Sequence, residues 1–193
     1  DRLQQQGIKN TFVHSFCSDI EYHFPQKQSE PSYDVAFIGN WDASRKRESY
    51  LKAIADRRLG LWGSNYWNTH CQESSLKDLC RGMCSYQEIP KVLGSAKMGL
   101  NILRPQNELG HNIRTFEIPA AGTLMLRGRS RDLLNLFTED REAVYFSTPE
   151  ELKNKVDYLL NNEVLLKQIA ESGYQKSKQH LISKRILEIE NIY

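Results

Sequence analysis

Residues 33–39 read Tyr-Asp-Val-Ala-Phe-Ile-Gly. The run from Tyr33 to Ile38 is short, apolar and closed by Gly39, which is typical of a strand that is buried on both faces. A polar turn at residues 40–44 and a helical stretch follow it. This unit of strand, turn and helix is the building block of α/β proteins.

The same alternation continues to the end of the chain. Strands that alternate with helices predict a parallel sheet covered by helices on both faces, so the expected fold class is α/β with three layers. Further strands are expected at residues 59–62, 98–103, 123–126 and 143–146. Helices are expected at about residues 45–55, 73–80, 89–95, 114–121, 133–137, 149–160, 164–178 and from 183 to the end.

Two of these helices carry clear local signals at one end. Thr148 is suited to cap a helix that has Pro149 in its first position and Glu151 three residues after the cap. Gly122 is expected to end the helix that precedes it, because glycine adopts the left-handed conformation of a helix terminus without strain.

The chain divides into a prelude and one domain. Residues 1–32 are polar and interrupted by Pro25 and Pro31, which indicates a linker or crossover segment before a domain at residues 33–193. The first residue is Asp1 and the start has no signal peptide, so we expect a piece of a longer, cytoplasmic protein.

Composition excludes several classes of function. The 193 residues carry a net charge of only +2, which argues against a nucleic-acid partner. No apolar run approaches the roughly 20 residues that a membrane span needs. The cysteines and histidines lack the spacing of a metal site, so no metal is expected and the thiols are interpreted as reduced, with a Cys80–Cys84 disulfide as the alternative.

The loop and helix start after the third strand, residues 101–122, hold the most informative polar side chains. Parallel sheets bind ligands beyond the carboxyl ends of their strands. The free N–H groups of a helix start attract anions, Gly110 allows close approach to the backbone, and Arg114 offers a guanidinium fork suited to phosphate. Three further candidate contacts in this stretch are His111, Asn112 and Thr115.

Glu117 lies one helical turn after Arg114, and two interpretations of it remain open. Its carboxylate could accept hydrogen bonds from a sugar diol, or it could form a surface ion pair with Arg114 on a plain helix. Arg47 likewise could reach a phosphate from the loop after Gly39, or it could be a solvated helix charge. The chain has no Gly-x-Gly-x-x-Gly motif and no Walker A loop to decide between these interpretations.

Together, several segments resemble the C-terminal domain of group 1 glycosyltransferases, and most closely the spore-maturation CgeB-like branch. Residues 112–122 are the most specific of them, and the resemblance covers about residues 33–190. Residues 16–24 also resemble the segment that crosses between the two domains of such enzymes. The segments that carry the resemblance are residues 33–39, 62–63, 96–101, 112–122 and 149–152.

The resemblance implies a GT-B enzyme with two Rossmann-like domains that face each other across a cleft. This chain would be the half that binds a nucleoside-diphosphate sugar, of the UDP or GDP type, without a metal ion. The N-terminal domain, missing from this chain, would bind the acceptor, which could be a glycan, a protein or a lipid. The alternatives are a binding module that kept the fold but lost catalysis, and a flavodoxin-like regulatory domain, against which Asp34 lies at the wrong end of its strand.

Site residues are carried over from the family by position. Glu117 would bind the donor ribose, and Gly82 and Met83 would hold the base through backbone groups. The position of a second glutamate found in many retaining relatives is Leu109 here, with Glu108 beside it, so the catalytic residue and the stereochemistry stay open. At the diphosphate the resemblance places Asn112, Ile113 and Arg114, together with Gly39 and Arg47 from the first loop. The remaining candidate binding positions are Gly63, Asn101, Gly110, His111 and Thr115.

Overall fold

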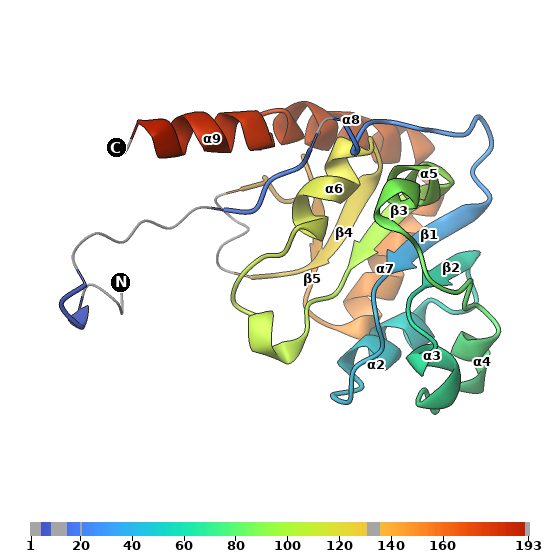
Figure 1. Ribbon diagram of the computed structural model, residues 1–193. Helices are drawn as coiled ribbons and strands as arrows, with labels where there is room; N and C mark the ends of the chain where they lie inside the picture. Colours follow the sequence, from blue (N-terminus) through green and yellow to red (C-terminus); the bar gives the residue numbers. More distant parts are fainter. Residues whose placement is uncertain (1–4, 9–14, 20, 131–135, 192–193) are drawn as a thin grey trace.

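The computed structural model describes residues 5–8, 15–19, 21–130 and 136–191. Within this part of the chain, five parallel strands form one sheet in the order β2-β1-β3-β4-β5, with helices on both faces (Figure 1). The prediction of a three-layer α/β fold with a parallel sheet is therefore confirmed. The strands are β1 (Tyr33–Ile38), β2 (Leu59–Trp62), β3 (Ala96–Asn101), β4 (Leu124–Gly128) and β5 (Val144–Phe146).

The helices cover the two faces of the sheet unequally. On one face, α2, α3, α4 and α7 pack over the larger apolar cluster, and on the other α5 and α6 pack over a smaller one. Helix α8 contacts β4, α6 and α7. The helices are α2 (Lys46–Ala53), α3 (Tyr66–Thr69), α4 (Ser74–Lys77), α5 (Ile89–Gly94), α6 (Arg114–Ala120), α7 (Pro149–Leu160), α8 (Glu163–Ser177) and α9 (Ile182–Glu190). Two 3₁₀ helices are η1 (Tyr86–Glu88) and η2 (Pro105–Asn107).

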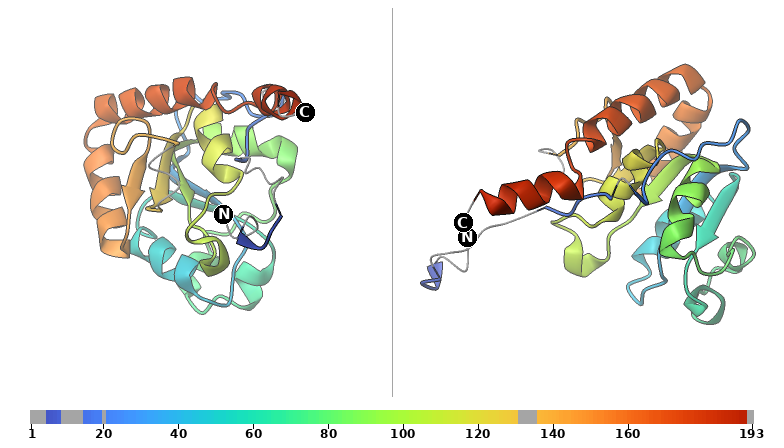
Figure 2. Two further views of the ribbon diagram at one scale, coloured as in Figure 1. Left: turned by 90° about the vertical axis from the view of Figure 1, so that its left-hand side faces the viewer. Right: turned by 45° about the horizontal axis from the view of Figure 1, so that its top comes forward.

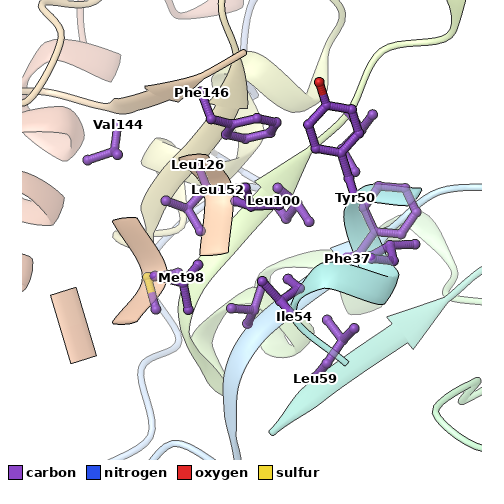
Figure 3. Close-up of a cluster of buried hydrophobic side chains, with 14 of the residues drawn as sticks. Phe37, Tyr50, Ile54, Leu59, Met98, Leu100, Leu126, Val144, Phe146 and Leu152 are labelled. Carbon is purple, nitrogen blue, oxygen red and sulfur yellow. The ribbon is translucent and has the colours of Figure 1, made fainter. Parts of the chain in front are cut away.

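Alternate residues of the strands supply the two clusters, as the period of a strand requires. In β4, Leu124 and Leu126 join the larger cluster, whereas Met125 joins the smaller one. Figure 3 shows the larger cluster, in which helix residues such as Ile54 and Leu152 meet side chains from the strands. Because both faces are covered, the strands lack the polar alternation of a half-exposed sheet.

Some predicted boundaries are confirmed and several are shifted; for example, the strand expected at residues 123–126 is β4, Leu124–Gly128. The bounds of β1 and β2 are as expected. The third strand was expected at residues 98–103, but β3 ends at Asn101, because the next carbonyl, of Ile102, accepts hydrogen bonds from Arg47 Nε and Nη2 (3.1 and 3.0 Å). The helix expected at residues 73–80 is only the short α4, because the chain after it runs beside β2, where Leu61 N donates to Leu79 O (3.2 Å).

Both predicted helix ends are present. The Thr148 side chain accepts a hydrogen bond from the backbone N–H of Glu151 (3.1 Å), and Pro149 occupies the first turn of α7. Helix α6 is followed by Gly122, whose φ of +73° lies in the left-handed region. The short helix expected at residues 133–137 lies in part outside the described residues, and its last two positions, 136 and 137, are not helical. Helix α3 was not predicted.

The segment before β1, residues 15–19 and 21–32, lies against the rest of the domain. Ser18 N donates to His180 O (2.9 Å) and Ile182 N donates to Ser18 O (3.0 Å), so this segment runs beside the junction of α8 and α9. Helix α9 extends outward on the same side (Figure 2). All four cysteines are free thiols, so Cys80 and Cys84 form no disulfide. Among the described helices, none is both long enough and apolar enough to cross a membrane.

Candidate functional site

The strand order places a topological switch point between β1 and β3, and we call the region between the loops that follow these two strands the crevice. The chain leaves β1 toward β2 on one side and later returns to β3 on the other, and such switch points are where open α/β sheets bind ligands. In Figure 1 the arrowheads of β1, β3 and β4 point toward the loop that carries η2. The walls of the crevice are therefore the loop after β1, residues 39–45, and the loop after β3, residues 102–113.

Arg47 ties these two loops together. Its Nε and Nη2 donate to the carbonyl of Ile102, and its Nη1 donates to the carbonyl of Asn40. The residue is only 8% exposed, so the interpretation of Arg47 as a solvated helix charge is wrong. Burial lowers its pKa to about 10, against an opposing effect of Asp42. The guanidinium is thus still positive at neutral pH and lies at the base of the crevice.

The loop after β1 is organised by a buried carboxylate. Glu48 is 2% exposed and accepts hydrogen bonds from Trp41 Nε1 and from Arg45 Nε (3.2 Å). Arg45 has a φ of 58°, which is uncommon for a residue with a side chain and marks local strain. Next to it, the Lys46 ammonium contacts the Glu108 carboxylate across the crevice. Three cationic side chains, at positions 45–47, therefore gather at this wall.

Glycines bring the first and second strand ends into contact. Gly39 N donates to Trp62 O (2.8 Å), and Gly63 N donates to Gly82 O (2.8 Å). A Cβ atom at Gly63 would lie 2.5 Å from the carbonyl oxygen of Gly39 and 2.6 Å from Trp67 Nε1, so no larger residue fits there. The predicted positions 39, 63 and 82 thus form one continuous row beside the crevice.

The start of α6 is held by a small polar cluster. Asn101 Nδ2 donates to Asn112 Oδ1 (2.8 Å), Asn112 Nδ2 donates to Asn101 Oδ1 (3.3 Å), and Thr115 Oγ1 donates to Asn112 Oδ1 (3.2 Å). Asn101 and Thr115 are buried, so they position the helix start and do not face the crevice. In the described part of the chain, no group accepts a hydrogen bond from the backbone N–H of Ile113 or Arg114.

The loop before α6 is fixed from two sides. The carbonyl of Gly110 accepts hydrogen bonds from Arg127 Nη2 (2.7 Å) and Ser130 Oγ (3.2 Å). The half-buried His111 accepts a hydrogen bond at Nε2 from the backbone N–H of Phe16 (3.3 Å), and its ring packs edge-on against that side chain. His111 therefore faces the segment before β1.

Glu117 differs most from its expected setting. The surface-pair interpretation placed it on an exposed helix edge, but the residue is 1% exposed. Its Oε2 contacts Arg114 Nη1, and its Oε1 lies 3.0 Å from His23 Nε2. The pair with Arg114 thus exists, but it is buried and has a third member from another part of the chain. Oε2, Nη1 and Nε2 are all buried, and none of them makes a hydrogen bond of good geometry to a described residue, although Nη1 lies against Oε2 and Nε2 lies against Oε1.

Residues 82–84 adjoin this cluster. Burial raises the pKa of the Cys84 thiol to about 11, and the positive charge of Arg114 acts in the opposite direction. The Met83 side chain is 80% exposed beside it. The structure therefore brings the positions predicted for base, ribose and diphosphate to one end of the sheet.

Sequence reasoning missed several residues that shape the site. Arg127 ends the apolar run of β4, and a lone charge at a strand end was a usable signal. Glu48 and His23 gave no such signal, because each is defined by partners that the fold brings to it.

Comparisons with known proteins agree with this fold. The model of a family described as glycosyl transferase-like matches residues 45–191. No curated protein matches the chain. Three solved structures share its fold at 12–13% identity. They are the C-terminal domain of the group 1 glycosyl transferase LpcC from Francisella tularensis (12%, TM-score 0.65, covering 86% of this chain and 99% of that one), Anabaena HepE in complex with UDP-glucose (13%, 0.75, 96% and 58%) and sucrose-phosphate synthase from Thermosynechococcus elongatus (13%, 0.75, 100% and 55%). The chain thus spans little more than half the length of the latter two.

Proposed function

This chain belongs to the glycosyl transferase-like family, and from that premise we propose that it is the donor-binding half of a GT-B glycosyltransferase. The reaction is the transfer of a glycosyl group from a nucleoside-diphosphate sugar to an acceptor. The observation that carries the proposal is the cluster at the start of α6, where the Arg114–Glu117 pair lies beside backbone N–H groups that have no acceptor among the described residues. These groups match a phosphate and a sugar diol.

The diphosphate is the leaving group, so negative charge develops on it as the bond to the sugar breaks. The N–H groups of Ile113 and Arg114 and the Arg114 guanidinium face the place where that charge forms. Lys46 and Arg47 add positive charge from the opposite wall. Donors that are fixed before the reaction stabilise a developing charge efficiently, and here they do so without a metal ion.

The ribose is read by the Glu117 carboxylate. Its Oε2 is shared with Arg114 in this structure, and the guanidinium can turn toward phosphate when a donor enters. The base lies against residues 82–84, where Gly82 and Met83 present backbone groups. The UDP and UDP-glucose complexes of HepE favour a UDP-type donor over a GDP-type donor.

The finer assignments follow from the resemblance in the sequence. We assign the chain to the CgeB-like branch of a bacterial, cytoplasmic enzyme, with an N-terminal domain that supplies the acceptor site. The acceptor is a glycan, a protein or a lipid. Residues 1–32 are then the segment that crosses between the two domains, and residues 33–193 are the nucleotide-sugar domain.

A second candidate function is a non-catalytic module that kept the fold. One observation favours it: Glu117 already contacts both Arg114 and His23, as a purely structural carboxylate would. The two candidates differ in nucleotide affinity, because a degenerate module has no reason to retain it.

Calorimetry on the 193-residue chain decides between them. The titrants are UDP, GDP, TDP, CMP and UDP-glucose, each with and without EDTA. We expect one nucleoside diphosphate to bind with an affinity that EDTA does not change. Binding that requires added magnesium or manganese contradicts the metal-independent proposal, and no binding of any titrant favours the non-catalytic module.

A further inference from the structure

His23 reaches the candidate ribose site from a segment that is distant in the sequence. Its Nε2 lies 3.0 Å from Glu117 Oε1, and the two side chains are 0% and 1% exposed. Resting on the proposed function, we infer that His23 is a positioning residue, which holds the Glu117 carboxylate in the orientation that reads the donor ribose.

A hydrogen bond to the His23 ring determines which of its two nitrogens carries the proton in the neutral ring. The backbone N–H of Asp19 donates to Nδ1 (3.2 Å), so Nδ1 acts as an acceptor. In the neutral ring the proton is then on Nε2, which lies 3.0 Å from Glu117 Oε1 but is not aligned with it as a hydrogen bond in this structure. The same turn is closed by a hydrogen bond from His23 N to Asp19 O (2.6 Å) and by one from Glu21 N to Asp19 Oδ1 (2.9 Å). The backbone thus fixes both the position and the tautomer of the ring.

Aromatic packing holds the ring from another direction. The His23 ring meets Tyr86 edge-on at a centroid distance of 4.9 Å, and Tyr22 packs on the same tyrosine at 5.3 Å. Tyr86 begins η1, three residues after Met83, which is proposed to hold the base. His23 therefore joins three parts of the site: the segment before β1, the base region and α6.

The two oxygens of Glu117 have different partners, so His23 can hold one oxygen while the other changes its partner. Oε2 contacts Arg114, which the proposed function needs at the diphosphate, whereas Oε1 contacts His23. When Arg114 turns toward phosphate, the buried carboxylate keeps a polar partner and Oε2 becomes available to the ribose. Without His23, moving Arg114 would leave the carboxylate buried and unpartnered, which is costly. His23 thus favours the donor-bound arrangement.

Substitutions of different length and polarity test this role. His23→Phe keeps a ring against Tyr86 but removes the donor, His23→Gln keeps an N–H that reaches Glu117, and His23→Asn is polar but too short. We expect His23→Phe and His23→Asn to weaken UDP binding about tenfold, the range for one contact to a charged group, and His23→Gln to stay close to the wild type. Pyrophosphate, which has no ribose, should bind all of them within about twofold of the wild type.

His70→Phe is the matched control. The His70 ring also contacts two aromatic side chains, Trp41 and Tyr66, but pairs with no carboxylate of the described residues, so its replacement should leave UDP affinity unchanged. Folding of each variant is checked by circular dichroism. If His23→Phe does not fold, the comparison of His23→Gln with His23→Asn still tests the inference.

The outcomes separate the inference from the proposed function. Unchanged or tighter UDP binding by His23→Phe overturns the inference, since His23 would then be inert or would shield Glu117. Equal losses for UDP and pyrophosphate also overturn it, because the effect would come from the helix start. If the wild-type chain binds neither UDP nor any other nucleotide, the proposed function is wrong, whatever the His23 variants show. A double-mutant cycle of His23→Phe with Glu117→Gln, read by thermal unfolding, then shows whether the two side chains are coupled at all.

Discussion

At the scale of single residues, the proposed function assigns nucleotide binding to the same Glu117 atoms that make its buried contacts. Its carboxylate is 1% exposed and contacts Arg114 and His23, so a change at this position removes a partner from the buried His23 and from the half-buried Arg114. An exposed i,i+3 pair would contribute at most about 0.5 kcal/mol to folding. Burial makes the loss larger, because the groups left behind cannot turn to water.

Glu117→Gln should therefore lower both nucleotide affinity and stability. We expect UDP binding to weaken by about 1–3 kcal/mol and the free energy of unfolding to fall by a similar amount, the range for leaving a buried polar partner unpaired. Pyrophosphate affinity should not change. Calorimetry and urea unfolding on the same variant give both quantities, with Glu171→Gln on the exposed side of α8 as the control. A variant with wild-type UDP affinity would show that Glu117 does not read the ribose.

Arg114 should distinguish a diphosphate from a nucleoside. Arg114→Ala is expected to weaken UDP binding by about 1.5–3 kcal/mol, the contribution of one charge-assisted contact, and to affect uridine binding much less. The measurement is calorimetry with both ligands, with the exposed Arg141→Ala as the control. Equal losses for UDP and uridine would instead place Arg114 in a structural role with Glu117.

At the scale of elements, local signals predicted the structure where neighbours agree with them. Thr148 caps α7 as its sequence indicates, because the cap requires only residues of the same turn. By contrast, α4 is shorter than the helix that the sequence predicts. Backbone groups of residues 79–81 form hydrogen bonds with β2, so they are not available to extend the helix. Helix α3 was missed because four residues carry too little periodicity to be seen.

The cap of α7 gives a direct test. Thr148→Ala removes the acceptor for Glu151 N, and we expect the free energy of unfolding to fall by about 1 kcal/mol. Thr69→Ala, at the exposed end of α3, is the control and should change stability by less than about 0.5 kcal/mol. Chemical denaturation at neutral pH measures both, and equal effects would argue against the cap.

The junction of α8 and α9 should make stability depend on pH. Burial, together with Arg185 and Lys176, lowers the pKa of His180 from 6.5 to about 4. The unfolded chain therefore takes up this proton at a higher pH than the folded chain, and stability falls as the pH drops from about 6.5 to about 4. Over this pH range, we expect the free energy of unfolding of His180→Gln to fall by roughly 1–3 kcal/mol less than that of the wild type. Urea unfolding at several pH values tests this, and an equal acid response in both proteins would contradict it.

At the scale of the whole molecule, the sequence predicted the layers and the loops that follow the strands, but not how distant segments meet. The stretch from Gly110 to Glu117 could be singled out because a polar loop enters a helix after a strand. The contact of His23 with Glu117 could not, since nothing local links residues from these two segments. The burial of Arg47 was hidden for the same reason: its acceptors, the carbonyls of Asn40 and Ile102, come together only in the fold.

Donor binding should stabilise the whole domain. A ligand that binds only the folded state adds about 2.7 kcal/mol at a hundred times its dissociation constant. For a chain of this length that corresponds to a rise in the melting temperature of roughly 5–10 °C. We expect this rise with UDP, with or without EDTA, and no comparable rise with uridine at the same concentration. Thermal unfolding followed by circular dichroism measures it, and a shift that disappears with EDTA would contradict the proposed metal-free site.

The position of the Arg47 guanidinium also affects how fast a ligand binds. The guanidinium donates hydrogen bonds to the carbonyls of Asn40 and Ile102, which belong to the loops after β1 and β3. The distance between these two loops is therefore fixed by one planar group. A ligand then meets walls already at their final distance, and little backbone order remains to be created on binding. Association should accordingly be fast, with differences between nucleotides appearing mainly in how long each one stays.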